Sequence, residues 1–547
     1  MTKVLIKIIL SVIFTFIILF WGFVKFKQPQ YKGNEELKGL LNNVEVYFDG
    51  VGVPHLLAEN EYDAFVALGY VHAQDRLWQM EVLRRIASGR LSELFGEKTV
   101  EIDKFFKSLG IEEAAKVDIQ KLDKSSDFYK LTEAYLNGVN QFISEGKTPI
   151  EYHLIGVEKE EFQIEDIYNV YGYMAFSFAM AHRTDPVLTD FKNKLGAKYL
   201  LDLNIDIDTM STVIPGTEKS YATVSFALNK IYEDLPFPTF IGSNSWVLGG
   251  EKTKSGKVIF ENDPHIAFSQ PSVWYQAHVK TPEYESYGFH LGLVPFPVMA
   301  HNREIAYGIT MFENDDIDFY EESVVPNDGN KYFYKGKELK FKTENKTIKV
   351  KGSESVSFEV KSSIHGPIIN SVIEQVQVKN PIAMDWVYTK HPNRLLEVCY
   401  LNAHAKSLEE FESGLPLIHA PGLNIMYGDV KGNIAWWATA KLYERKNDAN
   451  PKFILKGEKG EDDQLDFVPF TNNPQSVNPE SNYVYSANNQ SYALVEENSK
   501  KTKKYYHGYY LPEDRANRIV ELVTSKNDFT KEEVMDMAMD VTSNTAL

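Results

Sequence analysis

Gly242-Ser243-Asn244-Ser245-Trp246-Val247-Leu248-Gly249 is the stretch that decides the fold of this chain. Ser245 to Leu248 is a short β-branched and aromatic run closed by glycine, which predicts a strand. Directly ahead of it, residues 214–241 contain three prolines and little periodicity, which predicts a connector. A Gly-Ser-Asn-Ser string by itself is typical of a turn. Its position directly after a connector and at the start of a strand distinguishes this string from an ordinary turn.

The chain changes character on either side of this stretch. Upstream, helical periodicity dominates, and residues 61–95 repeat apolar side chains at a spacing of about 3.6. Residues 43–48 alternate and predict one strand ahead of that helix. Downstream, short apolar runs separated by Gly, Asn and Asp predict strands at residues 245–248, 258–260, 272–279, 305–309, 355–360, 425–427 and 434–438. The sequence therefore predicts a helical front and a strand-rich middle.

Length and composition exclude several classes of protein. At 547 residues the chain is too long for one minimal binding module, and 43% hydrophobic with 24% charged residues excludes an intrinsically disordered chain. The 58 Lys and Arg against 76 Asp and Glu give a net charge of −18, which repels phosphate and argues against nucleic acid as a partner. Cys399 is the single cysteine, so an intramolecular disulfide, a thiolate zinc site and an iron–sulfur cluster are excluded.

The amino terminus predicts an export signal or a membrane anchor. Lys3 and Lys7 precede an uncharged run, residues 8–24, which is followed by Lys25 and Lys27. As a helix this run spans about 25 Å at about 1.5 Å per residue, close to the hydrocarbon thickness of a bilayer. A small-x-small cleavage site does not follow it, which favours an uncleaved anchor. We therefore expect residues 1–30 to be a signal anchor and linker, and the rest to be extracytoplasmic (periplasmic).

A second block carries a resemblance to a known family. Residues 69–80 (GYVHAQDRLWQM) by themselves predict a partly buried helix with mutually satisfied polar groups. Asp49-Gly50 and Pro54-His55 precede them, and GRLSELFG follows at 89–96. Together with residues 242–249 they resemble the penicillin acylase (penicillin amidase) family of the N-terminal nucleophile (Ntn) hydrolase superfamily. The resemblance runs from about Val44 to the end of the sequence. It implies an α+β fold, a four-layer αββα sandwich with a helical N-terminal part.

The resemblance also implies an organisation into two chains of one precursor that cuts itself between Gly242 and Ser243. Residues 31–213 are then the helical α-chain region, residues 214–242 the spacer, and residues 243–547 the β-chain with the catalytic core. Family members usually continue well beyond the position that matches Asn544, so we expect this chain to be a fragment or a truncated member.

The residues that match the family's catalytic positions form a consistent set. Ser243 matches the nucleophile, and its α-amine, freed by cleavage and with an ordinary pKa of about 7.7 to 8.0, is the base. Asn424, within Pro421-Gly422-Leu423-Asn424, and the backbone N–H of Met311 match the oxyanion donors. His265 matches a position that orients the nucleophile, with a satisfied buried histidine as the alternative. Arg445 matches an arginine that holds the asparagine and amine network, and a plain ion-pair residue is its alternative.

A cluster of acidic residues matches the family's calcium loop. Asp315, the carbonyl of Ile317 and Asp318 would coordinate one structural Ca²⁺, and Asp190 matches a further ligand from the helical front. Without the resemblance, such a run is more often a solvated turn. The histidines show no zinc or iron spacing, and the sequence contains no phosphate loop or dinucleotide-binding glycine motif.

The expected function is that of a self-cleaving acylase acting through an acyl-enzyme on the amide bond of an acylated small molecule. Candidate substrates are a penicillin or cephalosporin side chain, an acyl-homoserine lactone or a lipopeptide. The alternative is an uncleaved, membrane-tethered binding or scaffold protein with a degenerate or truncated acylase fold. Expected partners are the substrate, the two chains of the precursor and the membrane.

Overall fold

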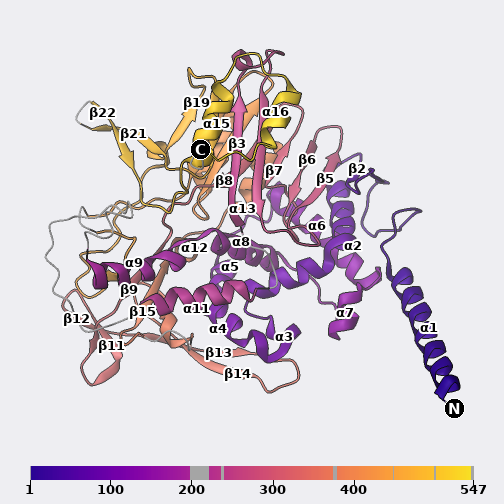
Figure 1. Cartoon of the computed structure of the whole chain (residues 1–547), viewed down its shortest axis with the longest axis horizontal. Helices are drawn as coiled ribbons and strands as arrows, with labels where there is room; N and C mark the ends of the chain where they lie inside the picture. Colours follow the sequence, from indigo (N-terminus) through magenta and orange to yellow (C-terminus); the bar gives the residue numbers. More distant parts are fainter. Residues whose placement is uncertain are drawn as a thin grey trace.

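The computed structural model describes residues 2–196, 221–235, 240–373, 378–446, 449–497 and 500–543. Helix α1 (Thr2–Lys27) projects away from the folded body (Figure 1). Its segment Val4–Lys27 is long and apolar enough to cross a membrane, and none of its most apolar window is buried; a signal sequence satisfies the same test. The helix meets the body at its C-terminal end, where the ring centroid of Phe23 lies 5.6 Å from that of His153.

The helical front is built around α2 (Glu61–Ala87), which begins at an N-cap where the Asn60 side chain accepts from the backbone N–H of Asp63. The helix predicted over residues 61–95 is confirmed up to Ala87; Gly89, at φ +62°, turns the chain before α3. The other helices of the front are α3 (Ser92–Phe95), α4 (Val100–Leu109), α5 (Ile111–Ile119), α6 (Asp127–Glu145), α7 (Ile150–Ile155), α8 (Ile164–Phe178) and α9 (Ala181–Leu195).

Helices α2 and α6 cross in backbone contact at two glycines. A Cβ on Gly69 would lie 1.9 Å from the carbonyl oxygen of Tyr135, and a Cβ on Gly138 would lie 1.9 Å from that of Val66. Any side chain at either position would therefore separate the helices. The close approach fixes the pair as one rigid layer.

Most of the strands form one large sheet. Its order is β1-β2-β5-β6-β7-β8-β16-β17-β19. The bounds are β1 (Glu45–Phe48), β2 (Pro54–Leu57), β5 (Tyr275–Lys280), β6 (Glu285–His290), β7 (Met299–His301), β8 (Ile305–Met311), β16 (Leu423–Asp429), β17 (Ile434–Thr439) and β19 (Gln475–Val477). A smaller sheet has the order β20-β3-β4, with β3 (Phe240–Leu248), β4 (Ile259–Ile266) and β20 (Tyr483–Ser486).

The remaining strands form peripheral sheets away from this pair. One has the order β10-β11-β12, with β10 (Val324–Val325), β11 (Asp328–Tyr334) and β12 (Lys337–Lys340). Another has the order β15-β9-β18, with β9 (Ile317–Glu321), β15 (Ile382–Trp386) and β18 (Leu455–Lys456). Two are hairpins, β13 (Lys342–Ile348) with β14 (Val356–Ser362) and β21 (Tyr492–Glu497) with β22 (Lys500–Tyr505). The strands predicted from the sequence all fall on strands of the structure.

The two sheets face each other between helical layers. The small sheet packs on β8, β16 and β17 through Val247, Met426 and Val484. Its other face is covered by α15 (Asp514–Thr524) and α16 (Lys531–Ala538), which bury Trp246 and Leu248. On the far side α2 contacts β2 and β5 of the large sheet. This order, helix, sheet, sheet, helix, confirms the predicted αββα architecture of the α+β class.

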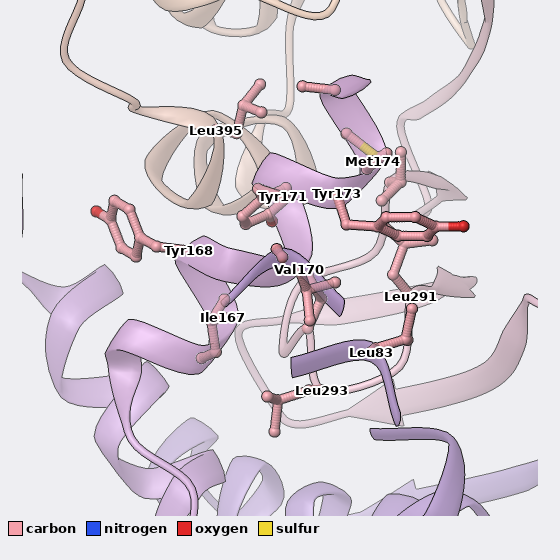
Figure 2. Close-up of a cluster of buried hydrophobic side chains, with 14 of the residues drawn as sticks. Leu83, Ile167, Tyr168, Val170, Tyr171, Tyr173, Met174, Leu291, Leu293 and Leu395 are labelled. Atoms are coloured by element: carbon pink, nitrogen blue, oxygen red, sulfur yellow. The ribbon is translucent and has the colours of Figure 1, made fainter. Parts of the chain in front are cut away.

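The main hydrophobic core surrounds α8. Figure 2 shows Leu83 from α2 and Leu291 and Leu293 from the segment after β6 on one side of this helix, with Leu395 of α13 (Leu395–His404) nearby. Two further short helices flank α13 in the sequence, α12 (Val387–Lys390) before it and α14 (Leu408–Gly414) after it. This core ties the helical front to the strands that carry the candidate site.

The predicted connector is not uniformly irregular. Its positions 214–220 and 236–239 lie outside the described residues, but Ala222–Glu233 forms helix α11, which packs on α9. Val224, Ala227, Leu228 and Ile231 are buried at helical spacing. The prolines on either side of this helix indicated a connector, so the helix with its apolar stripe was not predicted.

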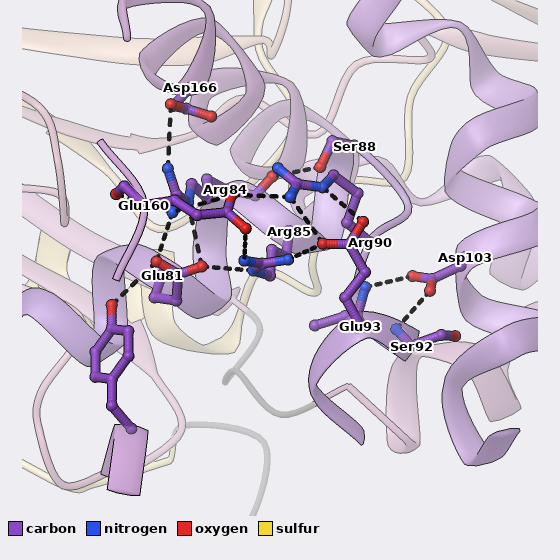
Figure 3. A network of polar contacts seen from close by, with 12 residues as sticks. Glu81, Arg84, Arg85, Ser88, Arg90, Ser92, Glu93, Asp103, Glu160 and Asp166 are labelled. Carbon is purple, nitrogen blue, oxygen red and sulfur yellow. Dashed lines mark hydrogen bonds and ion pairs between the residues drawn. The ribbon is translucent and has the colours of Figure 1, made fainter. Parts of the chain in front are cut away.

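A buried ion network closes the end of α2 (Figure 3). Glu81 is fully buried, and its carboxylate accepts from Arg84 at 2.7 Å, from Arg85 at 2.5 Å and from the Tyr152 hydroxyl at 3.0 Å. Arg85 also pairs with Glu160 at 3.0 Å. Two buried guanidinium groups therefore share one buried carboxylate.

We predict that Glu81→Ala destabilises the fold by about 3 to 5 kcal/mol, because it leaves Arg84 and Arg85 buried without their shared partner. Urea denaturation followed by circular dichroism measures the loss. Glu59→Ala, at an exposed position before α2, is the matched control and should change stability far less. Equal losses in the two variants would contradict this account of the network.

Candidate active site

Ser243 lies on the inner strand of the small sheet, where it is 2% exposed. Strand alternation directs its side chain to the same face as Val247, toward the large sheet. Its backbone N–H donates to Oδ1 of Asn488 at 2.7 Å, and its Oγ donates to the carbonyl oxygen of Gly242 at 2.6 Å. The hydroxyl is thus held against the peptide group that precedes it.

Gly242 occupies a conformation and a space that favour glycine. Its φ is +154°, and it lies at a β-bulge between β3 and β4. A Cβ at this position would lie 3.2 Å from Oδ1 of Asn488 and 3.4 Å from Cδ1 of Leu511. A side chain here would crowd the same oxygen that holds the Ser243 N–H.

Asn488 and Arg515, which were not predicted from the sequence, hold Ser243 in place. Arg515, on α15, donates to the Ser243 carbonyl oxygen at 2.7 Å, to Oδ1 of Asn244 at 2.5 Å and to Oδ1 of Asn488 at 2.9 Å. Burial lowers the pKa of Arg515 from its ordinary value. The residues lie 245 and 272 positions after Ser243, and no local pattern in the sequence marks them.

The side chains of Asn424 and Asn488 meet at the backbone carbonyl group of Met311. The Nδ2 of Asn424, on β16, and the Nδ2 of Asn488 each donate to the Met311 carbonyl oxygen at 2.9 Å. Trp436 donates its indole N–H to Oδ1 of Asn424 at 2.9 Å and so fixes the orientation of the amide. The structure thus brings together Ser243, Asn424 and Met311, three of the predicted catalytic residues.

A buried acid follows Met311. Glu313 is 5% exposed, and burial raises its pKa to about 8, although the charges of Arg183 and Arg515 oppose the shift. Its φ of +62° is uncommon for a residue with a side chain. Because the carboxyl lies near Arg515, it supplies part of the electrostatic environment of the Ser243 network.

His265 faces away from the Ser243 side chain. It pairs with Gly242 across the small sheet, so alternation places its ring on the side opposite to the Ser243 hydroxyl. The imidazole is 31% exposed, and its Nε2 lies 2.9 Å from Oδ2 of Asp263. The predicted role in orienting the nucleophile stays a prediction.

Arg445 contacts the acidic loop instead of Asn424. Its guanidinium donates to both carboxylate oxygens of Asp318, at 2.8 and 2.7 Å. Both oxygens of Asp315 are buried without a hydrogen-bond partner, and burial together with the charges of Asp318 and Asp185 raises its pKa well above the ordinary value. In this structure Arg445 makes an ion pair with Asp318, and the role predicted for it beside Asn424 stays a prediction.

The carboxylate that α9 brings to Asp315 is Asp185. It accepts from the Tyr509 hydroxyl at 2.6 Å, and Asp185 and Asp315 each raise the pKa of Tyr509. Asp190 lies further along α9, where its two oxygens accept from the backbone N–H groups of Tyr221 and Ala222, both at 2.8 Å. Over the described ranges, no group of three or more His, Cys, Asp or Glu side chains has a geometry that could by itself hold a metal ion.

The protein has four layers, and a buried serine lies on the central strand of the small sheet, directly after a glycine. These features define an α+β protein with the fold of an Ntn hydrolase. The chain belongs to the penicillin amidase family, whose model matches residues 43–547. The family identification made from the sequence is thereby confirmed.

Three relatives illustrate the similarity. An acyl-homoserine lactone acylase, QuiP, of Pseudomonas aeruginosa is 27% identical over 94% of this chain and 62% of its own. Penicillin acylase 2 proenzyme of Pseudomonas sp. strain SE83 is 28% identical over 94% of this chain and 66% of its own. Penicillin G acylase of Escherichia coli is 24% identical over 82% of this chain and 59% of its own. The chain thus spans about three-fifths to two-thirds of the length of these relatives.

A solved structure of a thermostable penicillin G acylase from Alcaligenes faecalis superimposes on 54% of this chain and 52% of its own. The TM-score is 0.48, at 22% sequence identity.

Proposed function

We propose that this protein is an amide-bond hydrolase, an acylase, that first cleaves itself between Gly242 and Ser243 and then uses Ser243 as its nucleophile. The observation that carries the proposal is the position of the Ser243 hydroxyl, which is buried and lies 2.6 Å from the Gly242 carbonyl oxygen. Membership of the penicillin amidase family supports the reaction class.

In the first reaction, Oγ of Ser243 attacks the carbonyl carbon of Gly242, and the C–N bond breaks as an ester forms. Water then hydrolyses the ester and leaves a carboxylate on Gly242 and a free α-amine on Ser243. The amide of Asn488 and the guanidinium of Arg515 hold the backbone on both sides of the reacting hydroxyl. This positioning lowers the entropic part of the barrier.

In the second reaction, the freed amine of Ser243 takes the Oγ proton while Oγ attacks the amide carbonyl of a substrate. The same proton passes to the leaving amine, and water hydrolyses the acyl-enzyme. Asn424 and the backbone N–H of Met311 are the proposed oxyanion donors. Asn424 is suited to this role because its amide is oriented by Trp436 within the Ser243 network.

The proposed substrates are acylated small molecules, since relatives are named for acyl-homoserine lactones and for penicillin. We further propose an extracytoplasmic location with α1 as the anchor. The 24-residue apolar segment at the amino terminus, unburied in its most apolar window, supports this location.

The first test concerns Ser243. Wild-type protein should run on a denaturing gel as two fragments that meet at Gly242 and Ser243, and Ser243→Ala should remain one 62.5 kDa chain without turnover, because one hydroxyl serves both reactions. Ser243→Cys should still cleave itself and hydrolyse substrates poorly. Ser245→Ala, on the same face of the strand, is the matched control and should still be cleaved.

A single band from exported wild-type protein would instead support the uncleaved scaffold. Turnover by Ser243→Ala would remove Ser243 as the nucleophile. A panel of acyl amides of graded chain length would identify the substrate class.

The second test separates binding from chemistry at Asn424. Asn424→Ala should leave substrate affinity nearly unchanged and lower kcat about 100- to 1000-fold, the usual cost of one oxyanion donor. Kinetics on fully cleaved protein measure both quantities. An unchanged kcat would assign Asn424 a structural role only.

We also propose that the acidic loop binds one structural Ca²⁺ through Asp315, the Ile317 carbonyl and Asp318. Asp315 fits a cation because its oxygens are buried without partners and repelled by neighbouring carboxylates, and Asp318 would share its oxygens between the ion and Arg445. Asp185 is a further ligand on α9, and the role predicted for Asp190 stays a prediction. Ca²⁺ takes 6 to 8 oxygens, so water and backbone carbonyls complete its shell.

Chelation should lower the Tm of wild-type protein, because bound ion stabilises the fold by mass action, about 2.7 kcal/mol at 100 times the Kd. Asp315→Ala should show little change on chelation, and Asp328→Ala, a surface carboxylate on β11, should respond like the wild type. Equal shifts in wild type and Asp315→Ala, or none in wild type, would exclude calcium at this loop.

A further inference from the structure

At one edge of the large sheet, strand β2 lies beside β5, where the chain before Gly242 meets the chain after it (Figure 1). The two strands are parallel, and their register pairs His55 with His278. Register partners present their side chains on the same face of a sheet. Two imidazoles from distant parts of the sequence are therefore neighbours.

The two rings approach each other through their Nδ1 atoms. Nδ1 of His55 lies 2.9 Å from Nδ1 of His278, and the ring planes are nearly perpendicular, at 83°. The side chains are 30% and 17% exposed, so a small ion can reach them from solvent.

Each outer ring nitrogen faces a carboxylate. Nε2 of His278 lies 3.2 Å from Oε1 of Glu285, and Nε2 of His55 lies 3.8 Å from Oδ2 of Asp49. Because an ionised carboxylate only accepts hydrogen bonds, Glu285 favours the neutral His278 tautomer with the proton on Nε2, whereas Nε2 of His55 lies beyond hydrogen-bond distance of Asp49. Nδ1 of His278 is then an acceptor, and without a bound ion it accepts from the Nδ1–H of His55 at 2.9 Å.

The carboxylates are held as anions by groups other than the histidines. Arg303 donates to both oxygens of Glu285, at 2.8 and 2.6 Å, and lowers the pKa of Glu285 to about 2. The backbone N–H groups of Val51 and Val53 donate to Asp49 and lower its pKa. Two imidazole nitrogens that meet at 2.9 Å between two anionic carboxylates form a site in which a cation can replace the shared proton.

We propose that His55 and His278 form a binding site for a divalent transition-metal ion such as Zn²⁺, with Nδ1 of each ring as ligand. A carboxylate on the second nitrogen is the usual arrangement behind a metal-bound histidine, because it fixes the tautomer and raises ligand basicity. Zn–N bonds of about 2.0 to 2.1 Å at a tetrahedral angle place the two nitrogens about 3.3 Å apart, so the rings need to separate by tenths of an ångström and tilt until both lone pairs converge on the ion. Water completes the coordination, since across the described residues three or more such ligands do not converge.

The position of the site gives it a structural consequence. Only three residue pairs join β2 to β5, from His55↔His278 to Leu57↔Lys280. A metal bound at the first pair adds a cross-link between the N-terminal hairpin β1-β2 and the strand that follows the proposed cleavage point. The ion therefore stabilises the association of these two segments.

The test uses the full chain, stripped of metal with a chelator and then supplied with excess Ca²⁺ to occupy the acidic loop. Calorimetric titration with ZnCl₂ should show one site that is lost in His55→Gln and in His278→Gln. Glu285→Ala should keep the site with about 10- to 100-fold weaker binding, the usual effect of removing a group behind a ligand. With Cu²⁺ as probe, electron paramagnetic resonance should report two nitrogen ligands in wild type.

His404→Gln is the matched control. His404 also has a carboxylate on Nε2, Glu61 at 2.8 Å, but its Nδ1 faces the Tyr400 carbonyl oxygen, so this variant should bind Zn²⁺ like the wild type. An unchanged metal-free melting curve shows that each variant folds. No Zn²⁺ binding by wild type, or equal binding by wild type and both His55 and His278 variants, overturns the proposal.

Discussion

The carbonyl oxygen of Met311 is the contact on which the site geometry depends, because it accepts one amide N–H from each of the two facing sheets. Asn424 belongs to the large sheet, and Asn488 directly follows β20 of the small one. A shift of one sheet against the other would leave a buried polar group unsatisfied, which costs more than the bond itself contributes. Since Asn488 also holds the Ser243 N–H, sheet packing sets the position of Ser243, the proposed nucleophile.

Two buried clusters of charged residues differ in how far their positive and negative charges compensate. At the end of α2, Glu81 is surrounded by two arginines, which in turn reach further carboxylates, so the charges compensate. At the acidic loop, Asp315 and Asp318 lie near the guanidinium of Arg445, and Asp185 adds a third carboxylate that raises the pKa of Asp315. Charge compensation in the first cluster serves the fold, whereas the excess of carboxylates in the second supports the calcium ion proposed there.

The strands, the helical front and the family could be predicted because their signals are local: the apolar run at residues 434–438, 3.6 periodicity after Asn60, and a glycine before Ser243. Helix α11 was missed because its stripe is short and lies between prolines. Asn488, Arg515 and Asp185 could not be predicted, since their roles arise from contacts across hundreds of residues. The face taken by His265 depends on strand register, which the sequence pattern did not specify.

The large sheet contains strands from both sides of the Gly242–Ser243 bond: β1 and β2 precede it, and β5 to β19 follow it. Before a cut at this bond, folding is unimolecular, and the two halves find each other at the high effective concentration of one chain. After the cut, the same sheet is an interface between two polypeptides, and its stability becomes dependent on protein concentration. If the proposed cut is made, unfolding releases two chains whose reassembly is second order, and the persistence of the fold then rests on slow unfolding.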